Sequence, residues 1–175
     1  MKKIMFNDRY GLTEAVLQGR KTMTRRVLKE DTALVEQFPK EYIIQRYAHC
    51  KVGEVVSIAQ SYRDTGLFDV YEAPKETKGW NNKLFVKAEI MPHRIQITDV
   101  RLERMQDISE VDCLKEGIEV DEIGVASIST NNKKSLYPCE HSERVAFADL
   151  IEHISGRGTW EKNHYVFVYE FKLVK

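Results

Sequence analysis

The sequence predicts one α+β domain, a small mixed β-barrel with short flanking helices. First, the chain has 175 residues, which suits a single domain with its own core. Second, several candidate strands of even length are interrupted by short helices, as in small mixed barrels. Third, strands and helices alternate too irregularly for a doubly wound sheet. We therefore expect residues 1–175 to form one domain, with insertions near residues 63–82 and 119–141.

The first part of the chain predicts a strand, a helix and an extended basic segment. Residues 3–6 are suited to a short strand, and apolar residues between 12 and 16 fall at helical spacing. Gly19 stands where a helix would end. Residues 20–26 then alternate as an extended segment leaving that helix.

Local apolar patterns and turn residues predict the elements in the middle of the chain. Residues 63–83 are rich in Gly, Asn, Asp and Pro and predict a loop. We expect two short helices, near residues 31–36 and 42–47, the first of them capped by Asp31. We expect strands over residues 54–60, 84–90 and 94–105. The third of these strands should contain a bulge near residues 98–99.

The last third predicts two helices and a strand. Ser109 is a candidate N-cap for a helix that stops at Gly117. Residues 119–141 are polar and predict irregular structure, an insertion or a lid over the site. A second helix over residues 145–154 should end at Gly156, and residues 165–174 form a strand with one wholly apolar face.

Charge and cysteine content limit the function classes. Lys+Arg and Asp+Glu both number 27, so attraction to nucleic acid must come from a local patch. Cys50, Cys113 and Cys139 are widely spaced and odd in number, which argues against a disulfide framework and for a reducing compartment. No stretch approaches the ~20 apolar residues of a spanning helix. We expect a cytoplasmic protein without a membrane partner.

The basic segment concentrates cations and hydroxyls that can hold phosphate. In an extended chain, one face carries Thr22, Thr24 and Arg26, and the opposite face carries Lys21, Met23 and Arg25. Arg20 adds a fourth cation. Two interpretations stay open at this point: an anion-binding strand, or a solvated basic edge strand that discourages aggregation.

Three segments resemble the ASCH domain, a branch of the PUA-like superfamily. The signature Gly19-Arg20-Lys21-Thr22-x-Thr24-x-Arg26 comes first. A helix ending in Glu116-Gly117-Ile118 and a closing strand Val166-Phe167-Val168-Tyr169-Glu170-Phe171 follow in the family's order. Trp80-Asn81-Asn82-Lys83 and Gly158-Thr159-Trp160-Glu161 are similar to marks of a longer, phage-associated bacterial subgroup.

The resemblance implies a reaction and its residues. Small bacterial members of the family are amidohydrolases that remove the acetyl group from N4-acetylcytidine with a lysine, a threonine and a glutamate. These roles would fall on Lys21, Thr24 and Glu116. Other members are regarded as RNA-binding modules, and ribonuclease activity has been linked to the family. The implied partner is thus RNA or a modified nucleoside.

The residue chemistry is consistent with amide hydrolysis. A threonine hydroxyl needs a base to take its proton, and a lysine is such a base only if burial or neighbouring cations lower its pKa. A glutamate at the C-terminal end of a helix can shuttle a proton or hold the cytosine amino group. The sequence also departs from the family pattern, since the chain is longer and Arg25 replaces an apolar residue.

Further residues are candidates for substrate or RNA contact. Trp80 beside Lys83 can stack a base while the lysine holds a phosphate, or can pack over the barrel mouth. Gln60 and Tyr62 can line the same mouth or be rim residues, and His93 can touch substrate or make a structural hydrogen bond.

We expect no cofactor and no metal. The chain has no Gly-rich phosphate loop. His49-Cys50 and Cys139-x-His141 lack paired close spacing on both sides.

Three functions stay open from the sequence. An amidohydrolase predicts a narrow pocket where Lys21, Thr24 and Glu116 converge. A non-catalytic RNA-binding module predicts an open basic groove. A ribonuclease would need an acid–base pair, such as Lys21 with His93 or Glu116, around a phosphate.

Overall fold

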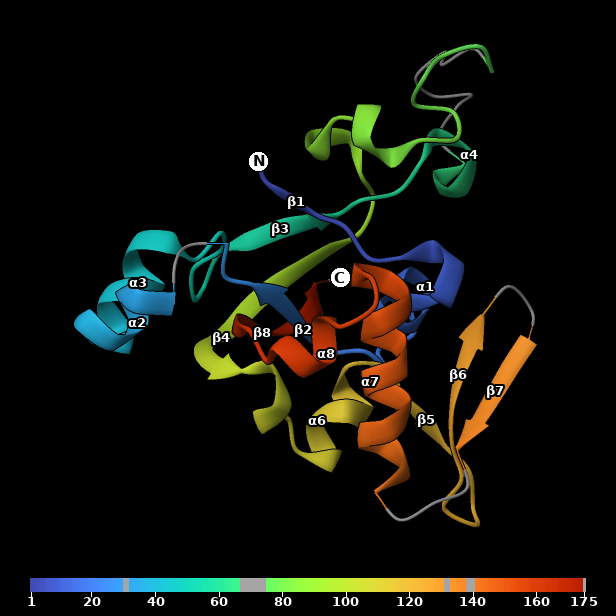
Figure 1. The fold of residues 1–175 in the computed structure, drawn as a ribbon. Helices are drawn as coiled ribbons and strands as arrows, with labels where there is room; N and C mark the ends of the chain where they lie inside the picture. Colours follow the sequence, from blue (N-terminus) through green and yellow to red (C-terminus); the bar gives the residue numbers. More distant parts are fainter. Residues whose placement is uncertain (30–31, 67–74, 131–132, 138–140, 175) are drawn as a thin grey trace.

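The predicted α+β class is confirmed. A computed structural model describes residues 1–29, 32–66, 75–130, 133–137 and 141–174. Its main sheet has five strands in the order β1-β3-β4-β8-β2 (Figure 1). The strands are β1 (Lys3–Ile4), β2 (Met23–Val27), β3 (Val55–Ile58), β4 (Arg94–Arg104) and β8 (Tyr165–Val174).

Strand β8 lies inside the sheet, between β4 and β2, and pairs antiparallel with both. Its apolar face is buried as predicted at Phe167, Tyr169 and Phe171, each at most 4% exposed, whereas Leu173 near the end of the strand is 36% exposed. Val166 and Val168 on the other face are also fully buried, because a central strand is covered on both sides. The bulge predicted in β4 is confirmed between Ile97 and Asp99.

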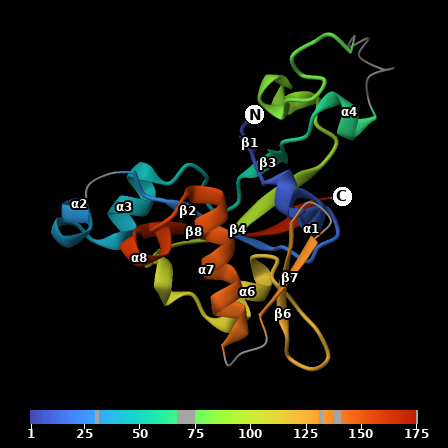
Figure 2. The same ribbon diagram turned by 45° about the vertical axis from the view of Figure 1, so that its right-hand side comes forward.

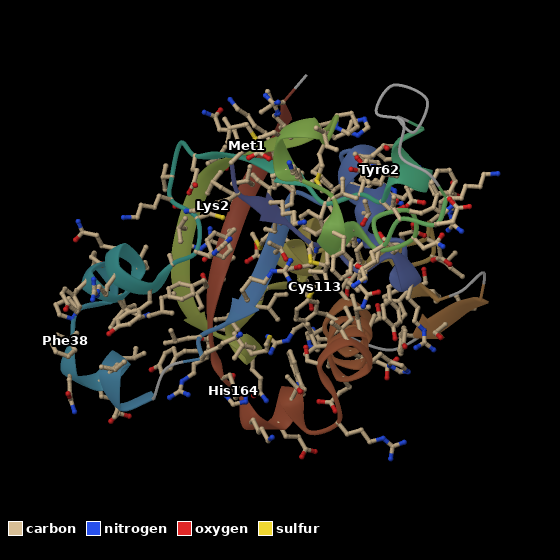
Figure 3. The ribbon with its side chains drawn as sticks, turned by 90° about the horizontal axis from the view of Figure 1, so that it is seen from above. Met1, Lys2, Phe38, Tyr62, Cys113 and His164 are labelled. Atoms are coloured by element: carbon tan, nitrogen blue, oxygen red, sulfur yellow. The ribbon has the colours of Figure 1, made fainter. Side chains whose placement is uncertain are left out.

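Short helices surround this sheet, and α7 crosses in front of it in both ribbon views (Figures 1 and 2). The helices α2 and α3 lie together at one end, where Figure 3 labels Phe38 at the outer edge. The predicted cap Asp31 lies outside the described residues. The helices are α1 (Leu12–Leu17), α2 (Thr32–Gln37), α3 (Lys40–Tyr47), α4 (Tyr62–Thr65), α6 (Glu110–Lys115), α7 (Ser142–Ser155) and α8 (Thr159–Lys162), with 3-10 turns at Asp8–Tyr10, Lys83–Phe85, Ala88–Ile90 and Met105–Asp107.

The expectation of irregular structure over residues 119–141 was wrong. Its described part forms a second, antiparallel sheet of β5 (Glu119–Val120), β6 (Ala126–Thr130) and β7 (Lys133–Tyr137). Ala126 and Ile128 belong to the buried core, so packing overrides a polar composition that favours no strand.

The strand predicted over residues 84–90 was also wrong, since the segment makes 3-10 turns. The Nζ atom of Lys3 donates to the carbonyl oxygens of Lys83, Leu84 and Val86, at 3.0, 2.8 and 2.7 Å. These acceptors therefore bond a side chain in place of a neighbouring strand.

The predicted barrel is not confirmed by the strand pairing. Among the described residues, no backbone ladder joins the edge strand β1 to the other edge, β2. A side chain links the two edges instead, because the Arg26 guanidinium donates a hydrogen bond to the carbonyl oxygen of Met5, just after β1. We call this meeting of the two sheet edges the seam.

The end of α6 is shaped by a glycine. Ser109 caps its start, accepting from the backbone N–H of Asp112 at 3.1 Å, as predicted. At its end, Ile118 N donates to Cys113 O at 3.1 Å and Gly117 N to Leu114 O at 2.9 Å, the pattern of a Schellman motif. Gly117 has φ +99°, a conformation that costs other residues about 1–2 kcal/mol.

Replacing Gly117 by alanine should therefore lower the free energy of unfolding by about 1–2 kcal/mol. An added Cβ would lie 3.6 Å from Lys21 Cβ, an ordinary van der Waals contact, so the expected cost comes from the backbone conformation. The matched control is Gly53→Ala, which has φ +84° and open space around it. Denaturant unfolding should give similar losses for both variants. A Gly117→Ala protein as stable as the native one would contradict the argument.

Candidate active site

The site is built around a buried ion pair that joins β2 to α6. Lys21, just before β2, donates from Nζ to Glu116 Oε2 at 2.6 Å and to Glu116 O at 2.7 Å. The two side chains are 2% and 6% exposed. The backbone supports this contact, because Thr22 N donates to Lys115 O at 2.9 Å. Two predicted catalytic residues, 95 positions apart, are thus brought together.

Arg25 holds the other side of the same carboxylate. Its Nη1 donates to Glu116 Oε1 at 3.2 Å, and its Nη2 approaches Asp112 at 3.1 Å and Glu103 at 3.4 Å. Lys21 and Arg25 share one face of the extended segment, as the alternation predicted, and Arg25 also contacts Met23 Sδ. Arg25 is therefore fixed among carboxylates, and its side chain is only 1% exposed.

The environment lowers the pKa of Lys21 below its ordinary value of 10.5. Burial is the main cause, since it penalises the charged ammonium. The charge and hydrogen bond of Glu116 oppose the shift, while Arg26 and Arg25 add to it. Lys21 therefore loses its proton more readily than an exposed lysine, as the base in the predicted chemistry must.

A pocket of about 320 Å³ opens beside the ion pair. It is lined by Lys21, Thr24 and Glu116, together with Arg25 and Arg26. Thr24 is 5% exposed, and among the described residues its hydroxyl has no hydrogen-bond partner. All three predicted catalytic residues thus reach one cavity; we call it the lysine pocket.

The sequence interpretation missed the apolar wall of this pocket. Helix α7 supplies Phe147, Leu150, Ile151 and Ile154, and Phe6 and Leu12 contribute from the chain's start. The 147–154 spacing was recognised as helical, but it carried no signal of which face would meet Lys21. Asp112 and Glu103, which pair with Arg25, were missed as well, because no local pattern connects either of them with the basic segment.

The remaining residues of the basic segment lie differently. Arg26 lines the lysine pocket and bonds the Met5 carbonyl. Arg20 is exposed and pairs with Glu119 at 3.0 Å. The backbone of Thr22 bonds Lys115 O and Phe171 N, and its side chain is not among those lining the lysine pocket.

Gln60, Tyr62 and His93 lie elsewhere, and none of them lines the lysine pocket. Gln60 is buried, and its Oε1 lies 2.8 Å from His93 Nδ1, so these two side chains satisfy each other. Tyr62, labelled in Figure 3 on α4, packs against a small cluster of Ala59, Val86 and Met91.

Trp80 and Lys83 also lie outside the lysine pocket. Lys83 Nζ donates to Phe6 O at 2.5 Å and pairs with Asp8 at 2.7 Å. It therefore anchors the segment after β1. The ring of Trp80 has Lys75 Nζ at 5.9 Å from its centre. The predicted pairing of Trp80 with Lys83 around a nucleotide stays a prediction.

The described residues contain neither a metal-ligand cluster nor a membrane-spanning helix. Within them, no group of three or more His, Cys, Asp or Glu side chains could hold a metal ion. Among the helices described, none is long and apolar enough to cross a membrane.

Two solved structures are similar to this chain. One is a protein of Enterococcus faecalis V583 from family DUF984, with 14% identity, a TM-score of 0.45, and coverage of 99% of this chain and 76% of the other. The other is an ASCH domain from Lactobacillus crispatus JV V101, with 16% identity, a TM-score of 0.42, and coverage of 98% and 78%. No protein-family model and no curated protein matches.

Nuclear magnetic resonance can test the Lys21 environment. The Nζ and Cε signals that disappear in Lys21→Met should titrate below pH 10.5 in the native protein. In Glu116→Gln the midpoint should move to still lower pH, because the carboxylate raises the Lys21 pKa. A midpoint at or above 10.5 in the native protein would contradict the assignment.

Glu116→Ala should lower the free energy of unfolding by about 3–5 kcal/mol, because it leaves the buried Lys21 ammonium without its ion-pair partner. The control is Glu119→Ala, which removes a carboxylate that is 41% exposed beside Arg20. That change should cost about 1 kcal/mol or less. Thermal or denaturant unfolding measures both, and equal costs would show that the buried pair has no special role in stability.

Proposed function

We propose that this protein is an amidohydrolase that removes an acyl group from the exocyclic nitrogen of a modified pyrimidine nucleoside such as N4-acetylcytidine. The observation that carries the proposal is Lys21, a buried lysine with a lowered pKa in a pocket that also holds the Thr24 hydroxyl. A perturbed lysine and a hydroxyl that line the same cavity are typical of a site with an activated nucleophile.

The first half of the reaction uses Thr24 as the nucleophile. The neutral Lys21 amine takes the hydroxyl proton while the oxygen attacks the acyl carbonyl carbon. The negative charge that develops on the carbonyl oxygen is stabilised by N–H groups of Arg26, which lines the same pocket.

The second half returns the site to its starting state. The proton passes from Lys21 through Glu116 to the leaving nitrogen, the C–N bond breaks, and the free amino group departs. Lys21 then takes a proton from water, which attacks the acyl ester on Thr24. A carboxylic acid leaves and the hydroxyl is restored, so one amide and one water give one amine and one acid.

The cation distribution favours this reaction over an open RNA groove. Lys21 and Arg25 are buried against carboxylates, and Lys83 is paired with Asp8. Cations neutralised in this way attract a long polyanion weakly. A small uncharged group entering the lysine pocket needs no such field.

The test is hydrolysis of N4-acetylcytidine by the native protein and by variants with folding checked by circular dichroism. Lys21→Met and Thr24→Val should each lower kcat/KM by about 10²-fold or more, since they remove the base and the nucleophile. Thr24→Ser, which keeps a hydroxyl, should retain activity. Lys115→Ala is the control, because Lys115 precedes Glu116 but is 38% exposed and pairs with Glu170 at 3.6 Å.

The pH profile adds a second readout. Because the reaction needs the neutral amine, the rate should rise with pH through the lowered Lys21 pKa and level off above it. In Glu116→Gln the rate should fall, because the proton path through the carboxylate is lost, and the midpoint of the residual rate should shift to lower pH. The absence of turnover on any acylated nucleoside, together with salt-sensitive RNA binding, would replace the proposal by the RNA-binding module.

A further inference from the structure

A second cavity, of about 400 Å³, lies at the seam. It is formed by β1 and the residue after it, by the end of β2 and the two residues that follow, by the end of α3 and the chain after it, and by β8. We call it the seam pocket. Its lining residues include Tyr47, His49, Cys50, Phe167 and Tyr169.

The seam pocket and the lysine pocket adjoin. Both are lined by Met5, Arg26, Val27 and Lys29. The hydrogen bond from Arg26 to the Met5 carbonyl therefore lies where the two cavities meet. A ligand that occupies both must pass this guanidinium.

The charge of the seam pocket differs from that of the whole chain. The protein has no net charge, yet the described lining carries Lys3, Arg26 and Lys29 and contains no carboxylate. Lys3 is engaged by main-chain carbonyls. Lys29 is exposed and has no hydrogen bond or ion pair among the described residues. Arg26 and Lys29 are thus the cations placed to meet an anion between the pockets.

Aromatic side chains line the interior of the seam pocket. Tyr169 and Phe167 are 1% and 4% exposed, and the Tyr169 hydroxyl is held by the backbone N–H of His49 at 2.9 Å. Partly buried Tyr47 adds a third aromatic side chain. Aromatic side chains beside cations are the combination that binds nucleotides in single strands.

We infer that the seam pocket binds the nucleotide next to the acylated base, so that the substrate is a single-stranded oligonucleotide. This inference rests on the proposed function. The acylated pyrimidine enters the lysine pocket, the neighbouring base enters the seam pocket, and the phosphate that joins them lies against Arg26 and Lys29.

The kinetic test compares N4-acetylcytidine, its 5′- and 3′-monophosphates, and dinucleotides with uridine on either side. One dinucleotide should have a kcat/KM at least about tenfold above that of the nucleoside, through a lower KM, as one stacked base warrants. A monophosphate that matches the dinucleotide would show that phosphate alone is bound. Equal kcat/KM for nucleoside and dinucleotides would overturn the inference.

Variants of Lys29 and Tyr47 test the phosphate contact and the base contact of the seam pocket separately. Lys29→Glu should bring the dinucleotide-to-nucleoside ratio of kcat/KM towards one, and Lys29→Arg should restore it. Tyr47→Ala should lower the ratio without changing the effect of an added phosphate. Lys115→Ala is again the control and should keep the native ratio.

A binding measurement tests the seam pocket independently of the proposed reaction. Calorimetry with the unmodified dinucleotides of cytidine and uridine should show tighter binding than cytidine, and Lys29→Glu should lose the difference. Binding of this kind without turnover would refute the proposed reaction and support the seam pocket. Turnover of the nucleoside without a dinucleotide preference in rate or binding would refute the seam pocket alone.

Discussion

The carboxylate of Glu116, buried between Lys21 and Arg25, is the contact on which the rest of the site depends. Buried charges are costly unless each finds a partner and its hydrogen bonds. Lys21 meets that requirement with two acceptors from one residue, and Arg25 spreads its donors over Glu116, Asp112 and Glu103. The arrangement fastens the start of β2 to the end of α6. It also places a lysine of lowered pKa at the wall of a cavity.

The same contact explains why two of the four cations in the basic segment, Lys21 and Arg25, are buried. Charges extend from Arg25 through Asp112 and Glu103 to Arg101, which pairs with Glu170 at 2.5 Å. Opposite charges cancel within this network, so little field remains for a distant polyanion. Arg26 and Lys29 lie instead where the two pockets adjoin. This distribution fits a short substrate better than a long duplex.

The open seam of the sheet gives these pockets their place. Strands β1 and β2 are the two edges, and an edge strand has unpaired backbone groups that something must satisfy. Here the Arg26 guanidinium donates a hydrogen bond to the carbonyl oxygen of Met5, just after β1. Lys3 of β1 donates to three carbonyl oxygens of the segment before β4. Where a side chain bonds these backbone groups, space remains between the edges β1 and β2. Direct backbone hydrogen bonds between the two strands would close that space.

Local patterns determined much of this protein without the structure. Alternation identified β8 and the bulge in β4, and a serine with a glycine bounded α6, because these signals act over a few residues. The resemblance to ASCH domains singled out Lys21, Thr24 and Glu116, whose common pocket only the tertiary structure formed. Nothing local could reveal that Lys83 anchors Phe6, that Gln60 meets His93, or that β5, β6 and β7 form a second sheet. Those outcomes depend on contacts between residues far apart in the chain, which the tertiary structure alone brings together.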